Sequence, residues 1–234
     1  IGTLYTAMVS ERFAHQTAGV FILRIEDTDK KREVEGAWEL VVEALDYYGI
    51  KVDEWQDLTG KEIGNYGPYK QSARENIYAV FIKDLVEKWL AYPCFCSSEE
   101  LEETRKTQEE YSQRPGYYGQ WAKWRNATSE DIQAELDKKT PFVIRLRSSW
   151  NYNKKIKYQD LLKWTIETSE NDMDIVIMKA DWLPTYHFAH VVDDYLMGTT
   201  HVIRWDEWLA STPLHIQMFA TMGWQAPKYG HLAP

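Results

Sequence analysis

Four side chains of complementary chemistry stand near the ends of three apolar runs in this sequence. Glu26 follows the first run, Tyr186 and His190 lie beyond the second, and Arg204 ends the third. In an open parallel sheet, ligands collect at the carboxyl ends of the strands, so these side chains would meet in one crevice if the runs are neighbouring strands. The crevice would present a carboxylate and a guanidinium to the same small molecule. That combination suits a zwitterion such as an amino acid.

The segment Val20–Asp29 carries the first of these clusters. Five of its first six residues are apolar, which predicts a strand buried on both faces. The strand would end in acidic residues, and Arg24 and Glu26, two residues apart, would share one face. A solvated strand end before a helix N-terminus, where acidic residues are favoured, is the alternative explanation.

Helical periodicity surrounds this segment. Residues 3–17 and 37–48 each carry apolar side chains on one face, so the chain is expected to begin as helix, strand and helix, half of a doubly wound α/β layer. Residues 57–69 hold several glycines and prolines, which predicts an irregular loop. Capping-box patterns predict three further helix starts, at Ser72, Ser97 and Thr128.

The later part of the chain returns from charged sequence to apolar runs. The alternating stretch 142–147 predicts an exposed or edge strand, and 173–179 predicts a strand of core type. Residues 185–192 predict one or two helical turns that place Tyr186 and His190 on one face, and 201–204 predicts a short strand. A last helix is expected from Ser211 onward.

Composition divides the chain into three segments. Residues 71–172 are richer in charge and in short helices than the flanking sequence, which indicates an inserted subdomain. The expected organisation is therefore a first core half at 1–70, the insertion at 71–172 and a second core half at 173–234.

Overall composition excludes several classes of protein. A net charge of -9 over 234 residues means that any contact with nucleic acid must be local. The two cysteines, Cys94 and Cys96, are too close for an ordinary disulfide and fit a reduced, cytoplasmic protein. The sequence contains neither an apolar run of membrane-spanning length nor a signal peptide pattern.

A set of motifs, in order along nearly the whole chain, resembles the glutamyl-tRNA synthetases, which are class I aminoacyl-tRNA synthetases. Ile1-Gly2-Thr3 is similar to the end of the class I "HIGH" signature. The other motifs are Arg24–Asp29, Gly67–Ser72, Pro184–Tyr186, Val191–Gly198, His201–Arg204 and Glu207–Pro213.

The resemblance implies an α/β fold: a class I Rossmann-type core with a parallel sheet, and an inserted α+β subdomain that binds the tRNA acceptor stem. It implies a ligase that activates L-glutamate with ATP and Mg²⁺ to glutamyl-adenylate and transfers it to the 3′ end of tRNA(Glu). Such activation depends on in-line positioning and charge stabilisation, so no catalytic nucleophile is expected among the side chains.

The resemblance also implies roles for individual residues. Glu26 would hold the substrate α-amino group, while Arg204 and Tyr186 would hold its side-chain carboxylate, the guanidinium in a bidentate grip. His190 would line the amino-acid pocket, at a position where the family often has Asn. Ordinary packing or ion pairing is the alternative for each. Further positions would line the ATP site or approach the tRNA terminus: Gly2, Thr3, Glu207 and Trp208 for ATP, and Thr28 for tRNA.

Some members of the family hold Zn²⁺ at a Cys-x-Cys pair, with a Tyr and a further Cys or His downstream. Here Cys94, Cys96 and Tyr118 are the candidate ligands, Tyr117 is also available, and Trp124 occupies the expected fourth position. Because zinc requires a closed tetrahedral set, two buried thiols without metal are the expected state and a zinc site is the alternative.

Several tryptophans stand where the family usually carries Gly: Trp55, Trp150, Trp164, Trp182 and Trp205. Glycine at such turns often serves a positive φ or a close approach, which a Trp would strain or crowd. We hypothesise that some of these letters are assignment or sequencing errors. A degenerate paralogue is the alternative.

The chain is expected to be a catalytic-region piece of a cytoplasmic, monomeric enzyme, with L-glutamate, ATP and tRNA(Glu) as partners. An Arg and a Ser that bind substrate are expected before Ile1 and the "KMSKS" loop beyond Pro234, so this piece alone should have little aminoacylation activity. The alternatives are the short paralogue that attaches glutamate to a modified tRNA base, or an inactive RNA-binding module of the same fold.

Overall fold

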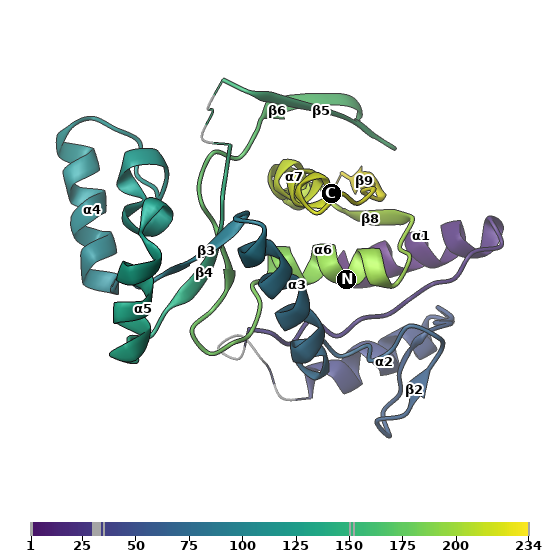
Figure 1. Ribbon diagram of the computed structural model, residues 1–234. Coiled ribbons are helices and arrows are strands. Elements are labelled where there is room, and N and C mark those ends of the chain that lie inside the picture. The colour runs from purple at the N-terminus through teal and green to yellow at the C-terminus, as the bar shows by residue number, and fades with distance from the viewer. Residues whose placement is uncertain (1, 30–33, 35, 150, 152, 234) are drawn as a thin grey trace.

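The chain contains both helices and strands, in runs of one to four elements of one kind (Figure 1). A computed structural model describes residues 2–29, 34, 36–149, 151 and 153–233. The helices are α1 Gly2–Gln16, α2 Ala37–Tyr47, α3 Glu75–Glu87, α4 Ser98–Glu110, α5 Ser129–Asp137, α6 Tyr186–Leu196 and α7 Thr212–Thr221. The strands are β1 Trp55–Gln56, β2 Glu62–Ile63, β3 Ala91–Cys94, β4 Val143–Leu146, β5 Lys155–Asp160, β6 Trp164–Ser169, β7 Val176–Met178, β8 His201–Trp205 and β9 Lys228–Leu232.

The strands form three sheets. In the four-stranded sheet, ordered β6-β5-β9-β8, β9 runs parallel to both β5 and β8, while β5 and β6 form an antiparallel hairpin. The second sheet, β3-β4-β7, is antiparallel, and β1 pairs with β2 alone. The register of β8 on β9 sets Arg204 directly opposite His231, which brings two polar side chains together in the interior.

The main core lies where α3, α6 and α7 pack on β4 and β7. Phe188, Val191 and Val192 of α6 are completely buried, together with Ile177 of β7 and Phe219 of α7. Helix α6 is buried on all of its faces from Phe188 to Asp194. Any polar side chain on α6 must therefore find a partner inside the protein.

The segment Val20–Ile25 does not form the regular buried strand that its composition predicts. It is extended and half-buried, and it pairs only through isolated parallel bridges, Ile22 with Glu54 and Ile25 with Lys70. Its backbone hydrogen bonds go to two different loops. The Leu23 N–H donates to the backbone carbonyl of Glu54, and the Ile25 N–H donates to that of Tyr69. Neither loop continues alongside it, so no ladder develops.

The prediction that 142–147 forms an exposed or edge strand is also wrong. Strand β4 is the central strand between β3 and β7, and Arg145 is buried within it. The guanidinium of Arg145 lies 4.0 Å from the centre of the Tyr117 ring and donates to the Asp174 carbonyl. A charged residue that points inward produces the same alternation in the sequence as a solvent-facing one. The β5–β6 hairpin and β9 were not expected from the sequence.

Two of the three predicted capping boxes are confirmed. Ser97 caps α4 and Thr128 caps α5. In each box the hydroxyl oxygen of the cap accepts the N–H of the acidic residue three positions later, and the carboxylate of that residue accepts the N–H of the cap. The prediction at Ser72 is wrong, because residues 71–74 form a 3₁₀ turn and α3 begins at Glu75. The Ser72 N–H instead donates to the Asp27 carboxylate, at 2.8 Å, and this bond ties the turn to the Arg24–Asp29 motif.

The expected division of the chain at 70/71 and 172/173 stays a prediction. Figure 1 shows α4 and α5 at one end of the molecule, beyond β3 and β4 and far from α1. The sheet crosses the second boundary, however, since β7 of the expected second core half pairs with β4 of the expected insertion.

The tryptophans singled out in the sequence fall into two groups. Trp164 and Trp182 adopt left-handed backbone conformations, with φ of 65° and 63°, and both side chains are exposed. Trp89, which the sequence did not single out, has φ of 59°. Trp55 lies in β1 and Trp205 has an ordinary extended φ of -69°. Trp150 lies outside the described residues.

We expect Trp164→Gly to raise the free energy of unfolding by about 1–2 kcal/mol, because glycine adopts positive φ without the steric penalty of an L side chain. Trp182→Gly should gain less, because it also loses the contact of the Trp182 ring with Phe142, 5.5 Å between ring centres. Urea unfolding monitored by far-UV circular dichroism measures the change. Trp55→Gly is the matched control, and it should lower stability because its backbone is extended and its ring packs on Trp38, 6.2 Å away. A loss of stability in both test variants would contradict the prediction.

Candidate active site

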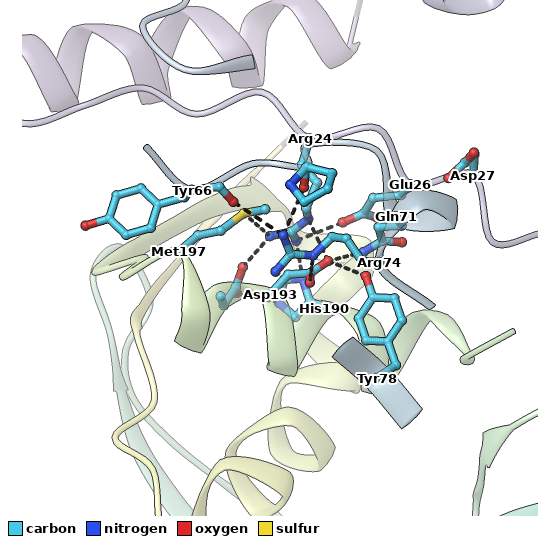
Figure 2. A network of polar contacts seen from close by, with 12 residues as sticks. Arg24, Glu26, Asp27, Tyr66, Gln71, Arg74, Tyr78, His190, Asp193 and Met197 are labelled. Carbon is cyan, nitrogen blue, oxygen red and sulfur yellow. Dashed lines mark hydrogen bonds and ion pairs between the residues drawn. The ribbon is translucent and has the colours of Figure 1, made fainter. Parts of the chain in front are cut away.

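Glu26 lies in a network of buried charges that joins the extended segment to α6 (Figure 2). Its carboxylate accepts from Arg24 at 2.9 Å, and Arg24 also donates to Asp194 at 2.9 Å. Burial raises the pKa of Glu26, and the positive charge of Arg24 opposes that rise. The side chain retains about a third of its solvent exposure, so a cationic ligand can approach it.

Asp193 is the centre of the same network. Its carboxylate is completely buried and accepts hydrogen bonds from Gln71 at 2.9 Å, Arg74 at 2.7 Å and Tyr78 at 2.8 Å. Figure 2 shows these three side chains reaching Asp193 from the side of α3 and the turn before it. The network therefore fixes α6, and every residue on it, relative to α3.

Tyr186 and His190 lie on one face of α6, as their spacing predicts. Their rings are 5.6 Å apart, and His190 Nδ1 lies 3.4 Å from the Arg24 guanidinium. Burial and the adjacent charge of Arg24 hold the pKa of His190 well below its usual value, so the imidazole is neutral. Within the described ranges, the Tyr186 hydroxyl forms no hydrogen bond with another residue.

Arg204 is buried at the end of β8, and its hydrogen-bond partners are all uncharged. It donates to Thr212 Oγ1 at 2.7 Å, His231 Nε2 at 3.2 Å, the Trp208 carbonyl at 3.3 Å and His215 Nδ1 at 3.5 Å. Among the described residues, no carboxylate forms an ion pair with it. These bonds use four of the five N–H groups of the guanidinium, so one has no partner among the described residues, and the expected bidentate grip stays a prediction.

The predicted clusters meet through continuous contacts. Glu26 bonds Arg24, Arg24 lies beside His190, the His190 ring is 4.6 Å from that of His215, and His215 accepts from Arg204. The carboxylate and the guanidinium are therefore joined through three intervening residues. The Glu26 charge is also close enough to affect Tyr186, whose pKa is raised chiefly by burial and next by that carboxylate.

Sequence reasoning missed several residues that complete the site. His215 of α7 bonds His187 of α6 at 2.9 Å, and His231 of β9 bonds Asp160 at 2.5 Å. Single histidines separated by many residues give no periodic signal. The sequence gives one indirect signal for these histidines: if Arg204 is buried, its guanidinium needs hydrogen-bond acceptors near it.

These buried histidines predict a loss of stability in acid. Burial lowers the pKa of His187, His190, His215 and His231 in the folded chain, whereas in the unfolded chain each titrates near pH 6.5. Below that pH the unfolded state binds more protons than the folded state, so the free energy of unfolding falls, by up to about 1.4 kcal/mol per pH unit for each histidine. Urea unfolding at about pH 7.5, 6.5 and 5.5 measures this slope.

His190→Asn provides the control for this prediction, because it removes one titrating group and should reduce the slope. Raised carboxylate pKa values act in the opposite direction, since burial raises the pKa of Glu26 and Asp194 and so favours the folded state at lower pH. Stability that stayed constant or rose between about pH 7.5 and 5.5 would contradict the assignment of these histidines as neutral.

The expected ATP-lining residues come from two neighbouring elements. Gly2 and Thr3 begin α1, and Glu207 and Trp208 lie in the 3₁₀ turn Asp206–Ser211 that follows β8. The ring of Tyr5 in α1 stacks on that of Trp205 at 5.5 Å, so the two elements lie side by side. The ring of Trp208 also packs against that of Tyr186, with 4.9 Å between the ring centres, which connects this region to the expected amino-acid pocket.

Thr28, the expected tRNA contact, is buried. Its carbonyl accepts from the Lys179 ammonium at 2.7 Å, so the segment is held down on the turn before α6. The role proposed for its side chain is not tested by this geometry and stays a prediction.

The cysteine pair has a different tyrosine beside it from the one expected. The Tyr117 hydroxyl lies 3.3 Å from Cys94 Sγ and 3.6 Å from Cys96 Sγ, whereas Tyr118 donates to the Arg114 carbonyl. Hydrogen bonds from Cys96 and Tyr117 lower the pKa of the Cys94 thiol. Two thiols and a phenol are one ligand short of a zinc tetrahedron, and in the part of the chain that the structure describes no three His, Cys, Asp or Glu residues gather around a metal position. These residues do not fit a zinc site.

The described helices include none that is long and apolar enough to span a membrane. The mixed α/β fold, with parallel pairing of β9 to β5 and β8 and a helical extension at one end, is that of a class I tRNA synthetase catalytic domain. The family model described as "tRNA synthetases class I (E and Q), catalytic domain" matches residues 1–233, and the chain belongs to that family.

The relatives include glutamate–tRNA ligases. The chain is 51% identical over 233 residues to the one from Acetivibrio thermocellus, which covers all of this chain and 42% of that protein. It also resembles a crystal structure of a glutamate tRNA ligase from Elizabethkingia meningosepticum in complex with its amino acid, with a TM-score of 0.90 and 36% identity over 99% of this chain and 46% of that one. The ligase from Elizabethkingia anophelis gives a TM-score of 0.88 at 37% identity, over 99% of this chain and 47% of that one. The chain therefore spans less than half the length of these relatives.

Proposed function

We propose that the protein containing this chain is a glutamate–tRNA ligase that activates L-glutamate with ATP and transfers it to the 3′ end of tRNA(Glu). The observation that carries the proposal is the Glu26–Arg24–His190–His215–Arg204 set of contacts. These contacts connect a partly exposed carboxylate to a guanidinium that, among the described residues, has no carboxylate partner, which supports a site for a ligand with both charges. The family and the named relatives support this reaction and lend no support to the base-modifying or inactive alternatives.

Each end of glutamate meets a group of opposite charge in this site. The α-ammonium would bind Glu26, with Arg24 giving up part of its ion pair, and the side-chain carboxylate would bind the open N–H of Arg204 and the Tyr186 hydroxyl. Neutral His190 packs between these groups and excludes water without adding charge. The ligand is thereby held in one orientation, with its α-carboxylate left for reaction.

The chemical step is displacement of pyrophosphate from ATP by that α-carboxylate. ATP with its Mg²⁺ is a co-substrate, and it would lie between the N-terminus of α1 and the turn after β8. Backbone N–H groups at Gly2 and Thr3 can approach phosphate there, and Trp208 joins the two subsites. Catalysis would come from orientation and charge stabilisation.

The test is ATP–pyrophosphate exchange by the full-length protein in the presence of tRNA(Glu), with L-glutamate, L-glutamine or no amino acid. We expect exchange with glutamate alone, and transfer that fails when the 3′ terminal diol of the tRNA has been oxidised by periodate. Transfer that survives periodate oxidation would favour the base-modifying reaction. Absence of any glutamate-dependent exchange would refute the proposal. The enzyme is proposed to work in the cytoplasm as a monomer.

A further inference from the structure

Asp160 is a buried carboxylate that belongs to none of the expected sites. One oxygen, Oδ1, accepts the N–H groups of Leu162 and Lys163, both at 2.9 Å, and so shapes the turn between β5 and β6. The other oxygen, Oδ2, lies 2.5 Å from Nδ1 of His231, and both side chains are completely enclosed. Burial opposes the charge of Asp160, but hydrogen bonds from His231 and from the turn lower its pKa overall.

The carboxylate fixes which nitrogen of His231 carries the proton. An ionised carboxylate only accepts hydrogen bonds, so Nδ1 of His231 must donate to it. Burial lowers the pKa of His231, which leaves the ring neutral and its Nε2 a bare acceptor. That acceptor faces Nε of Arg204 at 3.2 Å and also the Thr212 hydroxyl, which lies 3.0 Å away and itself accepts from Arg204. The pairing of β8 with β9 sets His231 and Arg204 directly opposite each other.

This arrangement positions Arg204 without neutralising it. A carboxylate in direct contact would hold the guanidinium equally well, but it would cancel the charge that a ligand must meet. A neutral imidazole supplies the acceptor and keeps Asp160 one residue further away. Thr212, the Trp208 carbonyl and His215 are likewise uncharged, so the positive charge of Arg204 stays directed at the site.

We propose that Asp160 and His231 are positioning residues that hold Arg204 in place and thereby set the preference of the site for a carboxylate over an amide. The proposal rests on the proposed function, since it deepens the recognition of glutamate against glutamine. Neither residue touches the ligand. Their effect passes through the tautomer of His231, which selects the direction of the hydrogen bond to Arg204.

The decisive variant in the full-length protein is Asp160→Asn. The oxygen of its amide can still accept from the turn, but its NH₂ group can donate to Nδ1 of His231. The ring then carries its proton on Nε2, so that two N–H donors, one from His231 and one from Arg204, face each other. We expect the KM for glutamate to rise about 10- to 100-fold, with the KM for ATP unchanged. The preference for glutamate over glutamine, measured as the ratio of kcat/KM values, should fall by a similar factor.

Two substitutions at His231 separate positioning from a merely structural role. His231→Leu removes the acceptor and should behave like Asp160→Asn, whereas His231→Gln can present a carbonyl oxygen to Arg204 and should restore most of the glutamate affinity. The double variant Asp160→Asn/His231→Gln should therefore bind glutamate better than Asp160→Asn alone. Failure of this rescue in folded variants, or equal changes in the KM for glutamate and for ATP, would overturn the proposal.

Asp57→Asn is the matched control, because Asp57 also accepts the N–H groups of a turn, those of Thr59 and Lys61, but lies far from Arg204 on the β1–β2 hairpin. It should leave both KM values unchanged.

Nitrogen-15 NMR of histidine-labelled protein gives a readout independent of activity. His231 should be the Nδ1–H tautomer in the wild type and should lose this tautomer in Asp160→Asn. An Nε2–H tautomer in the wild type overturns the positioning pair, whereas an inactive wild type with the expected tautomer refutes only the proposed function.

Discussion

Arg204→Met is expected to lower the kcat/KM for glutamate in the full-length protein on the order of 10³-fold, with a much smaller change in the KM for ATP. Methionine fills a similar volume but offers neither charge nor donor, so the ligand carboxylate would lose its cationic partner and keep only the Tyr186 hydroxyl. In the proposed function the guanidinium is the cation that meets this carboxylate, and within the described residues its hydrogen-bond partners are all neutral. Exchange kinetics at varied glutamate concentration measure the loss.

Arg105→Met serves as the control for this prediction, because Arg105 is an exposed residue of α4 that pairs only with its helix neighbours Glu102 and Glu109. Its kinetics should match those of the wild type. Circular dichroism must show that Arg204→Met remains folded. If folded Arg204→Met retained a glutamate kcat/KM within about tenfold of the wild type, the assigned role of Arg204 would be wrong.

Asp193→Asn is expected to lower the free energy of unfolding by about 3–5 kcal/mol. The substitution keeps the shape of the side chain but removes its charge, which leaves the guanidinium of Arg74, only 2% exposed, without its counter-ion. It also sets an amide N–H against the donors of Gln71 and Tyr78. Urea unfolding, with the midpoint and slope fitted together, measures the change.

An exposed ion pair gives the contrast for this second prediction. Asp84→Asn breaks the pair of Asp84 with Lys88 on the surface of α3 and should cost less than about 1 kcal/mol. The double variant Asp193→Asn/Arg74→Met removes both buried charges and should recover part of the lost stability. A cost below about 1 kcal/mol for Asp193→Asn alone would show that the network contributes little to the fold.

Local signals in the sequence were sufficient for most helices. The Ser97 and Thr128 capping boxes were correct because both partners of each box lie within four residues, and the spacing of Tyr186 and His190 was correct because α6 is regular throughout. The box at Ser72 failed for a non-local reason. Asp27, far away in sequence, takes the Ser72 N–H and draws that residue into a 3₁₀ turn.

Strand assignments depended on neighbours that the sequence does not name. An apolar run such as Val20–Ile25 becomes a strand only where another segment lies alongside it, and here two loops provide single bridges. Strand β4 was misplaced because Arg145 points inward to the Tyr117 ring. The same limit explains why Tyr118 was expected beside the thiols where Tyr117 stands, since both follow Gly116 and only the path of the loop separates them.

The sequence by itself determined the chemical types at the site and their order: an acid at Glu26, aromatic and imidazole groups on one helix face, and a base at Arg204. Its ordered motifs also determined the family. Only the tertiary structure decided that Arg204 is surrounded by neutral acceptors, that Asp160 and His231 stand behind it, and that Asp193 ties α6 to α3. The physical reason is that side-chain type and spacing are local properties, whereas the charge environment of a buried group is set by residues brought together from distant parts of the chain.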